Sequence, residues 1–247
     1  MPTRARYVAG VQTFYEDAYF ETVQKMSPVQ YYDDFLGAGS LVIPAAGSTE
    51  NGVDWAKKIV GAGPPTVAGV ASAVGGQISI ALTATSEKQD AVLYWADQKG
   101  LDITKGLVFE TRINLSTLPS VAGVEMVAGV HSNWIDGPDN NTCYARFQAN
   151  GNGVLNFQSY DGVTTVSKSA SKTLTTSDWA ILRIDASNIA DVKFSVNGVQ
   201  VSATGDVNFA ATGTLAVLQP YVSMYKASGT GVGTALVDYV KAWANRA

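Results

Sequence analysis

Hydrophobic and polar residues alternate along much of this chain, and residues 192–201 show the pattern most clearly. Apolar residues occupy every second position from Val192 to Val196, and the alternation resumes after the dipeptide Asn197-Gly198. Asn and Gly both tolerate a positive φ, which the tight turns of β-hairpins require. The stretch therefore predicts a β-hairpin with one buried face.

Segments of this kind recur along most of the chain, separated by turn residues, without helical heptads or an internal linker. One of them, 124–131, is continuously apolar, as in a strand that is buried on both faces. Pro220 indicates an edge position or a bulge, since proline lacks the donor that a central strand needs. The pattern predicts a single all-β sandwich. The expected strands cover residues 54–60, 76–82, 91–95, 107–115, 124–131, 144–149, 154–160, 179–185, 192–201, 215–225 and 235–243.

Residues 1–30 differ from the rest of the chain, being rich in aromatic and acidic side chains. Periodicity does not decide between a short helix and an extended arm. Such an arm either straps its own domain or docks on a partner. We therefore divide the chain into an N-terminal arm or strap, 1–30, and a β-sandwich, 31–247. The candidate partner-binding side chains of the arm are Phe14, Tyr15, Tyr19 and Phe20.

Composition and charge exclude several classes of protein. With 46% hydrophobic and 15% charged residues, the chain has enough apolar material for a substantial core. A net charge of −4 and the absence of a Lys/Arg cluster argue against nucleic-acid binding. No secretory signal is recognisable at the N-terminus, and no apolar run is long enough to span a membrane. Cys143 is the only cysteine, so it is expected to be a buried structural thiol, with no intrachain disulfide.

The order of several segments resembles the concanavalin A-like lectin/glucanase jelly roll, in the laminin-G-like variety found in bacteriophage virion proteins. The resemblance covers about residues 31–247 and implies a single antiparallel jelly-roll sandwich. The same fold serves lectins, glycosidases, adhesion modules and capsid decoration, so it does not by itself decide function. The segments that carry the resemblance are 32–35 (YDDF), 109–113 (FETRI), 179–184 (WAILRI), 192–198 (VKFSVNG) and 237–243 (VDYVKAW).

Retaining glucanases of this fold place two carboxylates on one strand, in an E-x-D-x-x-E or E-x-D-x-E run. Here the nearest candidate is Glu110, which Arg112 and Asn114 follow at the next same-face positions. Alternation from Leu107 to Leu115 places these three residues outward, which suits a surface ion pair of Glu110 and Arg112. His131 is the only histidine, and it is expected to be structural. We therefore expect no catalytic residue and no enzymatic activity.

A lectin-like site needs an exposed aromatic ring and a few polar groups that orient hydroxyls. The segment 131–141 offers such a set on one expected loop, although an Asp/Asn/Gly/Pro loop also forms a simple turn without any ligand. Three of its oxygen-bearing side chains suit Ca²⁺, but their spacing matches no known loop type, and we expect no metal and no other cofactor. The candidate ligand-binding residues are Asn133, Trp134, Asp136, Asp139 and Asn141; Trp55, Trp95, Trp179 and Trp243 are expected in the core or an interface.

The leading hypothesis is therefore a non-enzymatic bacteriophage structural protein, a capsid decoration or cement subunit. It would bind the shell of the major capsid protein through its arm, as a dimer or trimer that follows the local symmetry. Its expected location is the capsid surface of the virion, after production in the host cytoplasm. The alternative is a carbohydrate-binding module of a phage tail or fibre, or of a cell-surface adhesion protein, with a glycan as ligand.

Overall fold

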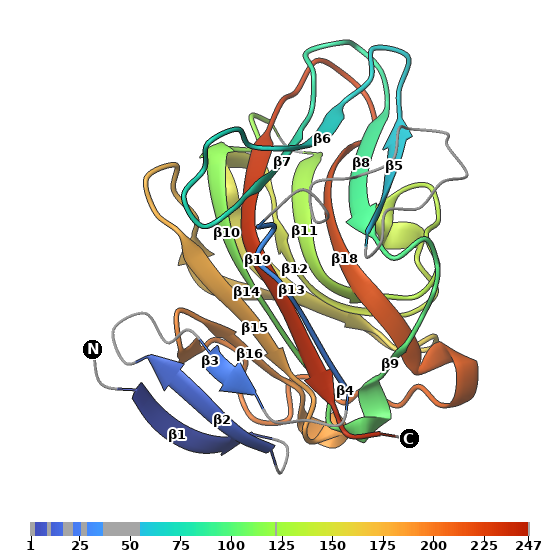
Figure 1. Ribbon diagram of the computed structural model, residues 1–247. Coiled ribbons are helices and arrows are strands. Elements are labelled where there is room, and N and C mark those ends of the chain that lie inside the picture. Colours follow the sequence, from blue (N-terminus) through green and yellow to red (C-terminus); the bar gives the residue numbers. More distant parts are fainter. Residues whose placement is uncertain are drawn as a thin grey trace.

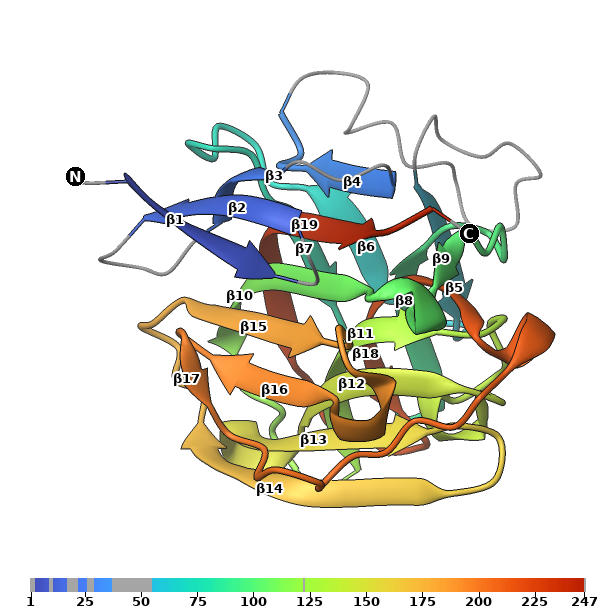
Figure 2. The same ribbon diagram turned by 90° about the horizontal axis from the view of Figure 1, so that it is seen from below.

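The computed structural model describes the backbone of residues 3–8, 11–16 and 22–25, and the complete residues 29–36, 55–121 and 123–246. Every strand pair in these ranges is antiparallel, and two sheets lie face to face as a β-sandwich (Figures 1 and 2). The short helices in these ranges are all of the 3-10 type. They are η1 (Ile103–Lys105), η2 (Pro138–Asn140), η3 (Gly151–Gly153), η4 (Ile189–Asp191) and η5 (Gly213–Leu215).

We call the two layers sheet I and sheet II. Sheet I has the order β17 (Val199–Gln200), β16 (Lys193–Val196), β15 (Ala180–Asp185), β10 (Val108–Thr117), β19 (Thr234–Ala244), β7 (Ile78–Ala81) and β6 (Thr66–Gly69), with β4 (Val29–Asp33) also paired to β19. Sheet II has the order β14 (Thr165–Thr173), β13 (Val154–Tyr160), β12 (Tyr144–Ala149), β11 (Val124–His131), β18 (Val217–Lys226), β8 (Gln89–Tyr94) and β5 (Ala56–Val60), with β9 (Leu101–Asp102) also paired to β18.

The first residues form strands rather than a helix. They make a small sheet of β1 (Thr3–Val8), β2 (Val11–Glu16) and β3 (Thr22–Lys25), in that order. Phe14 and Tyr15 lie in β2, but their side chains are outside the described residues, as are Tyr19 and Phe20 altogether. Because β4 begins at Val29 and pairs with β19, the sandwich starts two residues before the expected boundary.

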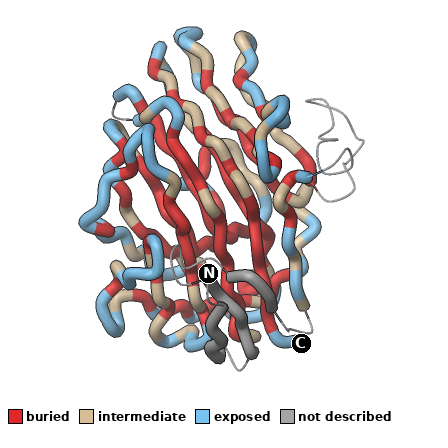
Figure 3. The backbone as a smooth tube through the Cα atoms, turned by 60° about the vertical axis from the view of Figure 1, so that its left-hand side comes forward, coloured by how far each residue is buried: buried red, intermediate tan, exposed pale blue. Residues whose placement is uncertain are grey.

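The main core fills the space between the two sheets, where buried residues run along the central strands (Figure 3). Aromatic rings connect the layers. Phe194 of β16 contacts Phe147 of β12 edge-on, with 5.3 Å between ring centroids, and stacks on Phe157 of β13 at 5.1 Å. Cys143 is buried as expected. No helix among the described residues is long and apolar enough to cross a membrane.

The expected hairpin at 192–201 is confirmed, with φ of 49° at Asn197 and 75° at Gly198. Its first strand buries Phe194 and Val196, but Val199 in the second strand is 57% exposed. The reason is that β17 is a two-residue strand at the edge of sheet I, paired with β16 on one side.

Pro220 lies in a central strand, so the expected edge position is wrong. It pairs with Val130 of β11 on one side of β18. On the other side, the pairing with β8 ends at Tyr221 and the pairing with β9 begins at Leu218. Proline is tolerated here because it falls in the gap between two partner strands, where the ladder requires no backbone donor.

Candidate functional site

The outer face of sheet II, the side turned away from the core, carries several buried polar side chains. Met126, Ala128 and Val130 of β11 point into the main core. Since side chains alternate along a strand, Glu125 and His131 point to the outer face. Both are nevertheless buried. This outer face is the candidate site.

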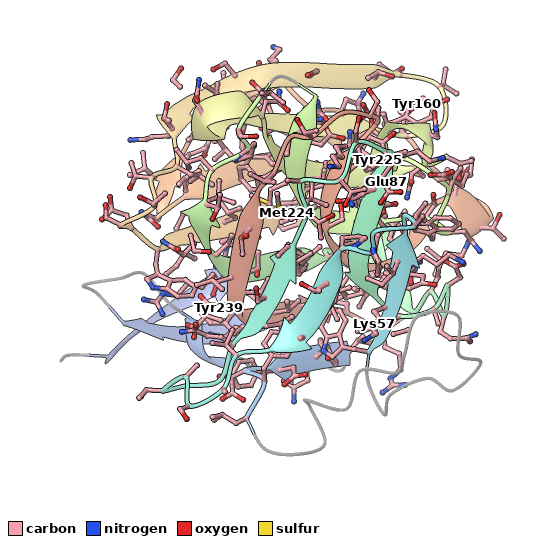
Figure 4. The ribbon with its side chains drawn as sticks, turned by 90° about the horizontal axis from the view of Figure 1, so that it is seen from above. Lys57, Glu87, Tyr160, Met224, Tyr225 and Tyr239 are labelled. Atoms are coloured by element: carbon pink, nitrogen blue, oxygen red, sulfur yellow. The ribbon has the colours of Figure 1, made fainter. Side chains whose placement is uncertain are left out.

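Strand register brings two carboxylates to this face from distant parts of the chain. Tyr225 of β18 pairs with Asp90 of β8 on one side and with Glu125 of β11 on the other. Two inter-strand spacings place the Cα atoms of Asp90 and Glu125 about 10 Å apart. Figure 4 shows Tyr225 on the outer side of sheet II, Met224 between the sheets, and Tyr239 on the outer side of sheet I.

Burial dominates the electrostatics of both carboxyl groups. It raises the pKa of Asp90 from 3.8 to about 7, although the indole Nε1–H of Trp134 donates a hydrogen bond to Asp90 Oδ2 at 3.1 Å. Burial likewise raises the pKa of Glu125 from 4.5 to about 7, against the opposing effects of Arg146 and a hydrogen bond from Gln148. Low polarity disfavours the charged form of an acid, so both groups hold a proton well above their ordinary range.

His131 lies between two tyrosine rings. It stacks on Tyr221 with 4.1 Å between centroids and on Tyr144 at 5.4 Å. The side-chain amide of Asn141 donates to His131 Nδ1 at 2.9 Å, which makes Nε2 the protonated nitrogen. Burial, with Arg146 nearby, lowers the pKa of His131 well below 6.5, so the ring is neutral. The described residues offer its Nε2 no hydrogen-bond partner, and the same holds for Glu125 Oε1.

Residues 132–143, which we call the covering loop, lie over this face. Trp134 packs against a small hydrophobic cluster of the outer face that includes Val92 and Tyr221. The ammonium group of Lys58 lies 4.6 Å from the centroid of the Trp134 ring. Further on, the carbonyl of Pro138 accepts a hydrogen bond from Arg146 Nη1 at 2.6 Å. The loop is therefore bound to the sheet at Trp134 and at Pro138.

The structure brings the five sequence-predicted ligand residues onto this loop, but most of them bind the protein itself. Asp136 pairs with Lys88 and Asp139 with Arg146. Asn141 is buried against His131, whereas Asn133 is exposed, and Trp134 is half-buried. No group of three or more possible metal ligands of the His, Cys, Asp and Glu types occurs in the described part of the chain.

The expectation for Glu110 is wrong. It is not part of a surface pair with Arg112, because the carboxylate is fully buried on sheet I. Its Oε1 accepts a hydrogen bond from the Tyr239 hydroxyl at 3.1 Å, and Arg183 Nη1 approaches Oε2 at 3.4 Å. Arg112 pairs instead with Asp238 at 2.7 Å. Alternation predicts which way a side chain points, but not what packs on top of it.

Sequence reasoning missed Asp90 and Glu125. A signal was present for Glu125, since it lies within 124–131, the segment expected to be buried on both faces. A carboxylate in such a strand is costly unless it is protonated or paired. Asp90 gave no such signal. Its place beside Tyr225 and near Glu125 depends on β18, which follows both residues by about a hundred positions or more.

No protein-family model and no curated protein matches this chain. Several solved structures are similar to it. A protein of unknown function from Shewanella oneidensis MR-1 is 14% identical with a TM-score of 0.56, over 88% of this chain and 89% of that protein. A β-1,3-glucanase from Mycobacterium marinum is 15% identical with a TM-score of 0.55, over 86% and 97%.

The carbohydrate recognition domain of Emp47p is 13% identical to this chain with a TM-score of 0.54, over 81% of this chain and 92% of that domain. At such identities the likeness shows the fold alone. The two antiparallel sheets and these neighbours agree with the resemblance seen in the sequence. The chain is a jelly-roll β-sandwich of the concanavalin A-like type, a fold found in glucanases and in lectin domains.

Proposed function

We propose that this chain is a non-enzymatic carbohydrate-binding domain, of a phage tail or fibre or of a cell-surface protein, and that it binds on the outer face of sheet II. The observation that carries the proposal is the buried polar surface whose hydrogen-bonding groups are incompletely paired. His131 Nε2 is a donor and Glu125 Oε1 an acceptor without a partner among the described residues. Sugar hydroxyls both donate and accept, so one ligand class satisfies both kinds of group.

Charge and ring chemistry favour a neutral ligand. Asp90 and Glu125 hold their protons up to a pH of about 7. Arg146, a buried cation on this face, is already paired with Asp139. Beside these groups lie the half-buried rings of Trp134 and Tyr225, whose flat surfaces suit the C–H face of a sugar ring. A neutral saccharide is the ligand that matches these groups.

Binding requires the covering loop to move, because it occupies the outer face. Lys88–Asp136 is an exposed pair that holds the loop from the residue just before β8. When only a fraction of molecules is open, the apparent Kd rises by the inverse of that fraction. A variant that loosens the loop should therefore bind more tightly.

A binding role is favoured over hydrolysis by the state of the two carboxyls. Glycosidases need one ionised and one protonated carboxyl across the scissile bond. Here burial raises the pKa of both Asp90 and Glu125 to about 7, so their environments single out neither carboxyl as the acid and neither as the base. The glucanase among the structural neighbours shares the fold at low identity and adds no support for catalysis.

The first test is retention of the full chain on immobilised neutral glycans, including β-1,3-glucan, mannan and N-acetylglucosamine oligomers. We expect at least one to bind, and Tyr225→Ala to weaken that binding about tenfold. Tyr32→Ala serves as a control, because Tyr32 is an exposed tyrosine of sheet I. A folded protein that binds none of the glycans would overturn the proposal. Release of reducing sugar that Glu125→Gln abolishes would contradict its non-enzymatic part.

The loop is tested with a matched pair of lysines. Lys88→Ala removes the contact with Asp136, and Lys168→Ala removes a Lys–Asp contact with Asp206 from a lysine of similar exposure, away from the loop. We expect Lys88→Ala to raise the apparent affinity about twofold or more and Lys168→Ala to leave it unchanged. Equal effects of the two variants would contradict gating by the loop.

Capsid decoration is the second candidate, and the separate N-terminal sheet favours it. Strands β1 to β3 pair with one another and, among the described residues, with no strand of the sandwich. Such a module suits attachment to a shell of major capsid protein.

Deletion of residues 1–28 tests this candidate, and it spares β4. The deletion should abolish cosedimentation with empty phage shells while the far-ultraviolet circular dichroism of the sandwich persists. Unchanged cosedimentation would exclude attachment through this sheet, and failure of the intact chain to sediment would exclude decoration.

A further inference from the structure

A cavity of about 230 Å³ opens at one end of the sandwich, and none of its lining residues belongs to the covering loop. It lies where β14 of sheet II meets the β16–β17 hairpin of sheet I. Its walls combine apolar and polar side chains. The lining residues are Lys172, Thr173, Leu174, Thr175, Asp178, Trp179, Ala180, Val196, Asn197 and Val199.

Trp179 is the aromatic wall of this cavity, and its ring is held in place from one side. The guanidinium of Arg112 lies 4.7 Å from the ring centroid. Arg112 is itself fixed by Asp238, at 2.7 Å. Trp179 is only half-buried. A ring that is braced on one face and partly exposed presents a rigid apolar surface at little entropic cost.

The polar rim is also preorganised. Asn197 Oδ1 accepts a hydrogen bond from the Ile181 backbone N–H at 2.7 Å, and its Nδ2 has no partner among the described residues. Asp178 Oδ2 accepts one from the Thr175 hydroxyl at 2.7 Å, which leaves its other oxygen as an acceptor. The Asn114 amide donates to the Asp178 carbonyl at 2.8 Å and fixes the loop. The rim therefore offers one donor, the Asn197 amide, and one acceptor, the second Asp178 oxygen.

From these features we propose that the Trp179 cavity is a second binding site, for a single neutral sugar ring. Its volume far exceeds the roughly 10–15 Å³ needed by one water and falls below the roughly 300–1,000 Å³ of sites for larger ligands. Lys172 and Asp178 offset each other's charge at the rim, which favours an uncharged ligand. One aromatic wall with a donor and an acceptor matches the amphipathic surface of a pyranose.

The test is a ¹H–¹⁵N NMR titration of the full chain with glucose, galactose, mannose and N-acetylglucosamine, each to tens of millimolar. We expect saturable shifts of the Trp179 indole and Asn197 amide signals with at least one sugar. Trp179→Ala should weaken that binding about tenfold. Tyr225→Ala should leave it unchanged, which separates this site from the outer face of sheet II.

Several results would overturn the assignment. These are the absence of any saturable shift, shifts that Trp179→Ala leaves intact, and equally tight binding of cyclohexanol, which would make the cavity merely apolar. Tighter binding of an acidic sugar such as N-acetylneuraminic acid would also contradict a neutral ligand. Asp178→Asn removes a charge while keeping an acceptor, so it should retain binding of the neutral sugar. Loss of binding in Asp178→Asn, with dichroism unchanged, would show that the ligand requires the carboxylate charge and would contradict a neutral sugar.

Discussion

Asp90→Asn should stabilise the protein at alkaline pH and have little effect at acid pH. The amide has the shape of a protonated carboxyl and cannot ionise. Its oxygen can still accept the hydrogen bond that the Trp134 indole donates to Asp90 Oδ2 at 3.1 Å. The substitution therefore removes the ionisation of a buried group and leaves its packing in place.

The magnitude follows from the pKa difference between the folded and unfolded states. Burial raises the pKa of Asp90 from 3.8 to about 7, a difference of about three pH units, each worth about 1.4 kcal/mol. Because the folded-state pKa is raised, the folded state holds the proton more tightly. The contribution of Asp90 to the free energy of unfolding is therefore complete below pH 4 and lost as the pH rises through 7. Asp90→Asn should gain up to about 4 kcal/mol relative to the wild type by pH 8.

The assay is urea denaturation followed by circular dichroism, for both proteins, at several values between pH 4 and pH 8. Asp206→Asn is a control of opposite sign, since Lys168 and the Ala203 backbone N–H lower the pKa of Asp206. This control should be less stable than the wild type above pH 4, without any gain toward pH 8. A difference between Asp90→Asn and wild type that stays constant from pH 4 to pH 8 would refute the reasoning.

Three further substitutions or reactions test the packing. Glu110→Ala should lower the free energy of unfolding by about 3 kcal/mol in urea denaturation, because it removes a buried carboxylate that faces the cations of Arg183 and Lys241; a change under about 1 kcal/mol would fit the surface pair expected from sequence. Gly129→Ala should cost about 3 kcal/mol or more in the same assay, since the new Cβ would lie 2.3 Å from a backbone carbonyl oxygen of β12; unchanged stability would contradict that contact. Cys143, whose pKa burial raises to about 12, should react with dithionitrobenzoate only after denaturation, and fast reaction of the native protein at pH 8 would contradict its burial.

The strands and turns could be predicted from local sequence because their causes are local. Alternation places Phe194 and Val196 on one face of a strand, and Asn197-Gly198 adopts the positive φ values of a hairpin turn. The resemblance to the jelly roll rests on the order of such segments, and the structural neighbours share that fold. For the segment around Trp134, local sequence also identified a cluster of polar side chains on one loop.

Only the tertiary structure showed which polar groups this loop covers. Burial is a property of the whole fold, since it depends on which elements pack on a given face. Glu110 and Glu125 both occupy outward positions of strands, yet both are buried. Asp90 and Glu125 share a face only because β18 pairs with the strands of both. Periodicity along one strand carries no information about its neighbours in the sheet. The sequence alone therefore determined the strands and the class of sandwich, whereas the pairing order decided which polar groups meet and lose their water.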